Sequence, residues 1–259
     1  MGDGPVRLSV RDDVAWVELA RPPVNALDAD LVAALAQAVL EVDALAPQAV
    51  VFSGGPRTLA AGGDVKWMHD RGAAGDRVAL RGFLRAIQAL FNDVERLPMT
   101  TIALVRGPTL GGGFELAMAC DLRIAADDAR IGFPEATLGL LPGAGGTQRL
   151  TEAVGRGIAL ELLYTGRIVD AAEGLRLGLL NRVCPAEDLE ETAGELLEEI
   201  LRTTAEARTA IKACVLAAIH EGRRAGLQTE TAEVERLGVS PSTLERLLAF
   251  QERRRAATA

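Results

Sequence analysis

Two glutamates stand beside glycine-rich segments, and their neighbours suit proton transfer. Glu115 follows three glycines in LGGGFELAMACD (110–121), and Glu135 comes directly after Pro134 in IGFPEATLGLLPGAGGTQRL (131–150). A carboxylate flanked by apolar side chains loses hydration, which raises its pKa and suits it to proton transfer near neutral pH. Each glutamate alone is equally compatible with a buried acid that pairs with an arginine or caps a helix. Two such acids, each beside a glycine-rich turn, favour a catalytic pair.

Glycine also precedes helical sequence at two places, AAGGDVKWM (60–68) and LGGGFELAM (110–118). Without a Cβ, a glycine lets its backbone N–H face a ligand closely, and the start of a helix adds partial positive charge to such amides. Two amides that converge on one point form an oxyanion hole. Taken singly, these glycines are also explained by tight turns or close helix packing.

The elements that must position these groups follow an alternating pattern in the first part of the chain. Residues 7–20 predict two strands joined by a turn at Asp12 and Asp13, and 49–54 and 100–107 read as buried strands. Helices are expected at 31–45, 78–97 and 113–119, and 122–132 predicts two short strands. This alternation predicts a parallel sheet with crossover helices.

Beyond about residue 145 the pattern becomes helical. Helices are expected at 145–154, 157–164, 170–177, 186–203, 205–221, 224–237 and 241–254, and only 181–185 looks extended. The chain therefore divides into an α/β core, residues 1–195, and a helical part, residues 196–259.

Composition excludes several classes of protein. Of the 259 residues 49% are hydrophobic, which is ample for a core, and the net charge of −8 argues against a nucleic-acid binder. Three scattered cysteines fit free thiols in a reducing compartment, and two histidines make a multi-histidine metal site improbable. The acidic residues near the N-terminus do not fit a signal peptide, and no apolar run spans a membrane. We therefore expect a soluble cytoplasmic protein without a metal.

At this point a set of motifs carries a family resemblance. It comprises RPPVNAL (21–27), AAGGDVKWM (60–68), GPTLGGGFELAMACDLRIAADDARIGFPEATLGLLPGAGGTQRL (107–150), YTGRIVDAAEGLRLGLLNRV (164–183) and AFQERR (249–254). With these segments the chain resembles the crotonase (enoyl-CoA hydratase/isomerase) superfamily, and most of all an enoyl-CoA hydratase. The 107–150 segment is the most specific of them.

The resemblance implies a fold and an assembly. The fold is an α/β spiral of ββα units followed by a helical C-terminal region used for trimerisation. The first part, 1–195, would hold an acyl-CoA site, and 196–259 would serve self-association as a homotrimer or hexamer. Neither nucleic acid nor a membrane is expected as a partner.

The resemblance also assigns roles to the residues singled out above. The amides of Gly63 and Gly112 would form the oxyanion hole for the thioester oxygen of an acyl-CoA. Glu115 would act as the base on water, Glu135 would deliver a proton to C2, and the amide of Gly143 would help to hold the water. Isomerases of the superfamily typically keep only the acid matching Glu135, so two acids favour hydration of a 2-enoyl-CoA to a 3-hydroxyacyl-CoA.

The resemblance is less specific about which residues contact CoA. Candidate contacts are Asn25, Ala26 and Ala61 through their backbone, together with Asp64, Lys66 and Trp67. Lys66 would meet a phosphate but equally fits an ordinary solvated lysine, and Trp67 would line the acyl pocket but equally fits the core. No cofactor is expected, because CoA is part of the substrate.

Other functions stay open. Within the superfamily the alternative is an enoyl-CoA isomerase, or a lyase or hydrolase acting on a specialised acyl-CoA. Two carboxylates could also serve a glycosidase, but sugar grooves are usually rich in aromatic residues, which make up 3% of this chain. A non-catalytic scaffold that binds acyl-CoA or RNA is disfavoured by the negative charge and by the presence of both acids and both glycine turns.

Overall fold

The computed structural model describes residues 4–258, and the chain divides into two compact units, residues 1–200 and 201–259. The sequence-based boundary at 195 falls inside helix α7 (Leu189–Leu201). The first three residues and the last, which belong to the predicted regions 1–195 and 196–259, lie outside the described residues.

The first unit is built on a six-stranded sheet. Its strand order is β1-β2-β3-β4-β6-β9, with an antiparallel β1–β2 hairpin and parallel pairing elsewhere. Asp12 and Asp13 form the hairpin turn with positive φ angles, which short polar side chains tolerate. The strands are β1 (Val6–Arg11), β2 (Val14–Leu19), β3 (Ala49–Ser53), β4 (Thr100–Val105), β6 (Leu122–Ala126) and β9 (Arg182–Cys184).

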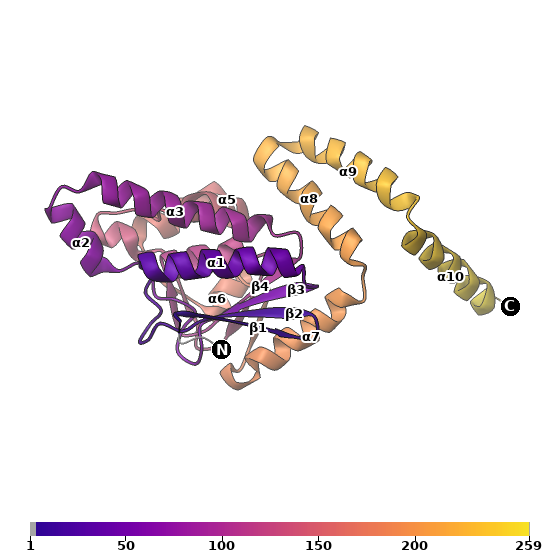
Figure 1. Cartoon of the computed structure of the whole chain (residues 1–259), viewed down its shortest axis with the longest axis horizontal. Helices are drawn as coiled ribbons and strands as arrows, with labels where there is room; N and C mark the ends of the chain where they lie inside the picture. Colours follow the sequence, from indigo (N-terminus) through magenta and orange to yellow (C-terminus); the bar gives the residue numbers. More distant parts are fainter. Residues whose placement is uncertain (1–3, 259) are drawn as a thin grey trace. The chain divides into compact units, whose positions relative to one another are not determined.

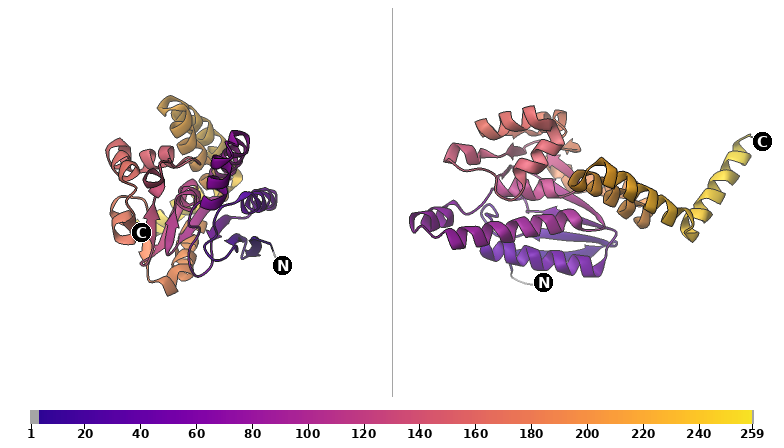
Figure 2. Two further views of the ribbon diagram at one scale, coloured as in Figure 1. Left: turned by 90° about the vertical axis from the view of Figure 1, so that its left-hand side faces the viewer. Right: turned by 90° about the horizontal axis from the view of Figure 1, so that it is seen from above.

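Strands β3 and β4 are buried almost throughout, as their continuous apolar sequences predict for the middle of a parallel sheet. Helices α1 (Ala29–Leu45) and α3 (Arg77–Arg96) pack side by side along this sheet (Figures 1 and 2). Asp28 caps α1 by accepting a hydrogen bond from the amide of Leu31.

A second, three-stranded sheet was not predicted. It has the order β5-β7-β8, with β5 and β7 parallel and β7 and β8 antiparallel. Its strands are too short to show a hydrophobic period: β5 (Pro108–Leu110), β7 (Arg130–Gly132) and β8 (Val169–Asp170). This sheet matters for the site, because α4 (Gly112–Ala119) follows β5 and the short 3₁₀ helix η1 (Pro134–Leu138) follows β7.

Helix α5 (Gly146–Thr165) is interrupted at Gly155, where φ is +76°, so the two helices predicted at 145–154 and 157–164 are joined across a kink. The other elements of the first unit are α2 (Val65–Ala73), α6 (Ala171–Arg176), η2 (Ala186–Asp188) and α7.

The second unit consists of helices, as predicted. Helices α8 (Ala205–Glu221) and α9 (Arg223–Gly238) form a tight hairpin (Figure 1), in which a Cβ on Gly226 would lie 2.6 Å from that of Ala218. They are followed by α10 (Pro241–Thr258).

Candidate active site

Glu115 is a buried carboxylate whose first oxygen is held by two backbone amides. It lies in the first turn of α4 and is 3% exposed. The amides of Ala144 and Gly146 donate to its Oε1 at 2.7 and 2.8 Å. Burial raises the pKa of Glu115 above its ordinary value, while the two amides and the charge of Arg149 oppose that rise. Through Oε1, Glu115 therefore caps the start of helix α5, as the helix-capping alternative expects. Its Oε2 accepts no hydrogen bond from a described residue.

The turn that supplies these amides precedes α5. Gly145 has φ of +107° and is the N-cap of that helix. The amide of Gly146, the first residue of α5, has no acceptor within the helix and donates to Glu115, and the amide of Ala144 donates from just before the cap. A Cβ on Gly146 would lie 3.0 Å from Glu115 Cγ and 2.9 Å from Phe133 Cε1. Glycine is needed here because the backbone approaches the glutamate side chain closely.

Glu135 has very different surroundings. It lies in η1 and is partly buried, and its Oε2 is shielded from solvent without a hydrogen-bond partner among the described residues. Burial raises its pKa to about 7, and the nearby charge of Glu115 adds to the rise. A Cβ on Gly111 would lie 2.5 Å from Glu135 Oε1, so the glycine that precedes α4 also makes room for the second acid.

Two backbone amides lie at adjoining positions beside these acids. Leu27 donates to the carbonyl of Gly62 and accepts from the amide of Asp64, a pairing that turns the N–H of Gly63 away from Leu27. Gly112 is the first residue of α4, so its N–H has no acceptor within the helix. A Cβ on Gly112 would lie 3.9 Å from the nitrogen of Gly63. Neither N–H donates a hydrogen bond to another described residue, so both are available to a ligand.

Gly143 lies at the edge of the same turn. Its carbonyl accepts a hydrogen bond of 2.7 Å from Gln88 Nε2, and its amide donates to no described residue. The amides of Ala144 and Gly146, which hold Glu115, were not singled out in the sequence. The signal for them was present, since GAGG precedes a helix just as the two glycine segments used above do.

The structure places three of the predicted CoA contacts in two loops that are hydrogen-bonded to each other, the one before α1 and the one before α2. Asn25 is 4% exposed, and its Nδ2 donates to the carbonyls of Gly54 and Leu59, among others. The amide of Ala61 donates to Val24, and the carbonyl of Ala26 accepts from the guanidinium of Arg21. The side chain of Asn25 therefore holds the two loops together.

The other three candidates lie at the start of α2. Asp64 caps this helix by accepting from the amide of Trp67 at 3.0 Å. Lys66 is exposed and pairs with Asp70 at 2.7 Å. Trp67 is partly buried, and its ring centroid lies 5.1 Å from that of Phe83 on α3. The roles of these residues in substrate binding stay predictions.

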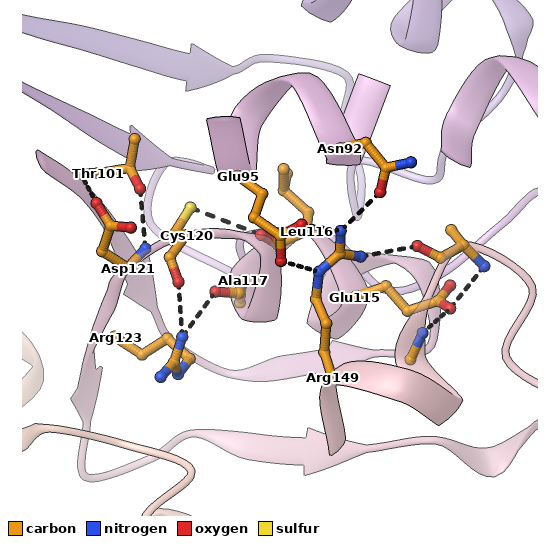
Figure 3. A network of polar contacts seen from close by, with 12 residues as sticks. Asn92, Glu95, Thr101, Glu115, Leu116, Ala117, Cys120, Asp121, Arg123 and Arg149 are labelled. Atoms are coloured by element: carbon orange, nitrogen blue, oxygen red, sulfur yellow. Dashed lines mark hydrogen bonds and ion pairs between the residues drawn. The ribbon is translucent and has the colours of Figure 1, made fainter. Parts of the chain in front are cut away.

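A polar network behind Glu115 was missed in the sequence. Arg149 is 7% exposed and bonds to Glu95 and Asn92, which reach it from α3 (Figure 3). Its Nη1 also donates to the carbonyl of Ala144, whose amide holds Glu115. Arg149 lies more than fifty residues from Glu95 and Asn92 in the sequence, so this connection becomes apparent only in the folded chain.

Residues 4–258 contain no group of three or more His, Cys, Asp or Glu side chains placed to hold a metal ion. Within the same range, no helix has both the length and the apolar composition required to cross a bilayer.

Comparison with known proteins places the chain in a family. The chain matches an enoyl-CoA hydratase of Bacillus anthracis in three dimensions, with a TM-score of 0.88, 35% identity and 96% of each chain covered. Its fold is therefore the crotonase fold. The sequence model of the enoyl-CoA hydratase/isomerase family matches residues 9–258, and the chain belongs to this family.

Two curated relatives illustrate the similarity in sequence. A probable enoyl-CoA hydratase of Mycobacterium bovis is 38% identical over 244 residues, which cover 93% of this chain and 92% of the relative. A crotonyl-CoA hydratase of Syntrophomonas wolfei is 35% identical over 256 residues, which cover 96% and 95%.

Proposed function

We propose that this chain is an enoyl-CoA hydratase, which adds water across the C2=C3 bond of a 2-enoyl-CoA to give a 3-hydroxyacyl-CoA. The observation that carries the proposal is a buried glutamate, Glu115, and a partly buried one, Glu135, beside the unpaired amides of Gly63 and Gly112. One glutamate has an oxygen held by backbone amides, and the other has a pKa of about 7.

The two glycine amides would bind the thioester oxygen of the substrate. Addition at C3 moves negative charge onto this oxygen, so donors placed there stabilise the enolate more than the substrate. Removal of one such donor in an enzyme costs roughly 2.7–4 kcal/mol of transition-state stabilisation. Both donors are backbone groups held by the fold, so they need no reorganisation when charge develops.

The two glutamates would divide the proton transfers. Glu115 takes a proton from water through Oε2 while the water oxygen bonds to C3, because Oε1 is already held by Ala144 and Gly146. Glu135 gives its proton to C2, for which its raised pKa suits it. The unpaired amide of Gly143 is available to orient the water. Exchange of one proton with solvent then restores both acids.

Substrate binding and assembly belong to the same proposal. CoA enters as part of the substrate, with Lys66 near a phosphate and Trp67 at the acyl group, and no separate cofactor takes part. Self-association as a homotrimer or hexamer is supported by an exposed apolar stripe on α8, formed by Ile211, Val215 and Ile219 at four-residue spacing. A cytoplasmic location is consistent with the cysteines Cys120, Cys184 and Cys214, which form no disulfide.

The direct test is incubation of the protein with crotonyl-CoA while the absorbance of the conjugated enoyl thioester is followed. Loss of the absorbance, with 3-hydroxybutyryl-CoA identified by mass, supports the proposal. A panel of longer, branched and aromatic 2-enoyl-CoA substrates would define the acyl group. If no member of the panel is hydrated, the proposed hydratase function is contradicted.

The alternative is an enoyl-CoA isomerase. It is favoured by the unpaired Oε2 of Glu135, because one carboxyl group can carry a proton between two carbons without help from a second acid. A 3-enoyl-CoA substrate separates the two functions, since an isomerase raises the absorbance of the conjugated product. An isomerase would also keep its rate in the variant Glu115→Gln.

A further inference from the structure

The guanidinium group of Arg149 connects α3 to the turn before α5. Its Nε donates to Glu95 Oε1 at 3.0 Å and its Nη2 donates to Asn92 Oδ1 at 3.0 Å. Its Nη1 donates to the carbonyl of Ala144 at 3.1 Å, on the peptide chain that also supplies the Glu115 donors. The side chain is almost fully buried, so these bonds are shielded from water.

Helix α3 holds the same turn at a second point. Gln88 donates to the carbonyl of Gly143 at 2.7 Å, and Gln88, Asn92 and Glu95 follow one another at intervals of four and three residues on one face of the helix. We call Gln88, Asn92, Glu95 and Arg149 the α3 clamp. It fixes the carbonyls of Gly143 and Ala144, and therefore the direction of the neighbouring amides.

The turn has little freedom to find another arrangement. Gly145 has φ of +107°, and a Cβ at this position would overlap Nη1 of Arg149. The guanidinium therefore lies directly against the backbone between the two amides that bind Glu115. A change in its position would move both donors together.

We propose that Arg149 is a positioning residue for the general base: through the α3 clamp it holds the Ala144–Gly146 turn so that both amides reach Glu115 Oε1, and its charge favours the carboxylate form. The inference rests on the proposed function for its kinetic consequences, but not for the state of the carboxylate.

The electrostatic part follows from the charges around Glu115. Arg149 of α5 lowers the pKa of Glu115, against the larger effect of burial. The neighbouring acid Glu135 of η1 interacts unfavourably with the charged form, and Glu95 of α3 lies behind Arg149 as its partner. Arg149 is the cation that acts on Glu115, so its removal should make this carboxylate harder to ionise.

Arg123 is a matched control, because its guanidinium also bonds to buried carbonyls. Its Nε donates to the carbonyl of Leu179 at 2.7 Å. Its Nη1 donates to the carbonyl of Cys120 at 2.8 Å (Figure 3). These bonds hold the end of α4 and do not involve the turn that binds Glu115. Loss of this arginine should weaken the fold without moving the base.

The experiment compares Arg149→Met, Arg149→Lys and Arg123→Met in the full chain with crotonyl-CoA. For Arg149→Met we expect kcat to fall about 100-fold with KM changed less than about threefold, because the base is misplaced rather than the substrate. The acidic limb of the pH profile of kcat/KM, which requires ionised Glu115, should move up by about one pH unit.

The other two variants separate charge from geometry. Arg149→Lys keeps the charge but not the planar fork, so kcat should be reduced while the acidic limb moves up less than in Arg149→Met. Arg123→Met should lower Tm and leave both the limb and kcat close to wild type. If Arg149→Met behaves like Arg123→Met, the inference is wrong.

Arg149→Met leaves Glu95 buried without its partner and could prevent folding. The double variant Arg149→Met/Glu95→Met removes this problem and should show the same shift of the acidic limb. An unshifted limb in the folded double variant would overturn the inference.

A ¹³C NMR titration of the Glu115 carboxyl group, assigned with Glu115→Gln, reports the same shift without catalysis. If the wild type does not hydrate crotonyl-CoA, the proposed function fails while this titration still tests Arg149. An unchanged titration in Arg149→Met would reject its electrostatic role.

Discussion

The surroundings of Glu115 and of Glu135 act on the two carboxyl groups in opposite ways. Around Glu115, burial raises the pKa of the carboxyl group, while two backbone amides and Arg149 of the α3 clamp oppose that rise by stabilising the carboxylate. Around Glu135, burial outweighs a hydrogen bond from the residue's own backbone, and one oxygen has no hydrogen-bond partner among the described residues. Position along the chain does not produce this difference. It arises from which backbone groups the fold directs at each acid.

One fold can in this way supply both a base and an acid near neutral pH. A base must be ionised although it is buried, and this requires donors that are already oriented. An acid must keep its proton, which only requires that water and donors be excluded. In the proposed reaction the glycine-rich turn before α5 would serve the first need, and the short helix η1 would serve the second.

The largest effect is expected when each acid is replaced separately. Glu115→Gln and Glu135→Gln should each lower kcat for hydration by about 10³-fold or more, because each removes one proton transfer. They should differ in exchange of the C2 protons of butyryl-CoA in D₂O, which requires only the acid beside C2. Glu115→Gln should retain this exchange and Glu135→Gln should lose it. The exposed Glu152→Gln is the control, and exchange lost equally in both active-site variants would contradict the division of roles.

A smaller loss is expected when the turn is disturbed and both acids stay in place. Gly146→Ala brings a Cβ within 3.0 Å of Glu115 Cγ and 2.8 Å of Pro142 Cβ, so the base must move and kcat should fall about 100-fold. Gly157→Ala, in the same helix with no atom within 4 Å of the new Cβ, should instead stabilise the protein by up to about 1 kcal/mol. Steady-state kinetics and thermal unfolding measure both. Equal activity of the two variants would show that the turn does not position Glu115.

The protonation of Glu135 should also give hydration a characteristic dependence on pH. In hydration Glu135 must carry its proton, so activity should be present below its pKa of about 7 and fall as the pH rises through that value, by about tenfold per unit at higher pH. Initial rates of kcat/KM between pH 5 and 9 test this. A rate that keeps rising above pH 8 would show that Glu135 does not donate the proton.

The smallest effect concerns stability. Glu135 has a folded-state pKa of about 7 against an ordinary value of 4.5, so the folded chain holds more protons than the unfolded chain between these values. Its contribution is therefore present below about pH 4.5 and is lost as the pH rises to about 7. Because the group is partly exposed, we expect about 1 kcal/mol after allowance for solvent screening. Urea unfolding at pH 5 and pH 8 measures how the free energy of unfolding depends on pH. This dependence should be smaller by that amount in Glu135→Gln than in the wild type. An identical dependence in the two proteins would contradict the burial of this acid.

Local patterns predicted most of the helices and the central strands. The helix at 205–221 has the predicted bounds, and the break between 154 and 157 coincides with the positive φ of Gly155. Strands β5 and β8 escaped prediction because they have three and two residues and exist only through pairing with β7. The 3₁₀ helix η1 was likewise missed, although Glu135 within it was identified by its neighbours.

The sequence by itself determined which residues could do chemistry: two acids in apolar segments, glycines before helices, and motifs specific enough to indicate the family. Only the tertiary structure decided that Ala144 and Gly146 hold Glu115, that Arg149 lies behind them, and that Glu135 keeps an unpaired oxygen. The physical reason is that helix caps and glycine conformations depend on adjacent residues. Desolvation and the direction of an amide depend instead on segments that meet only after folding.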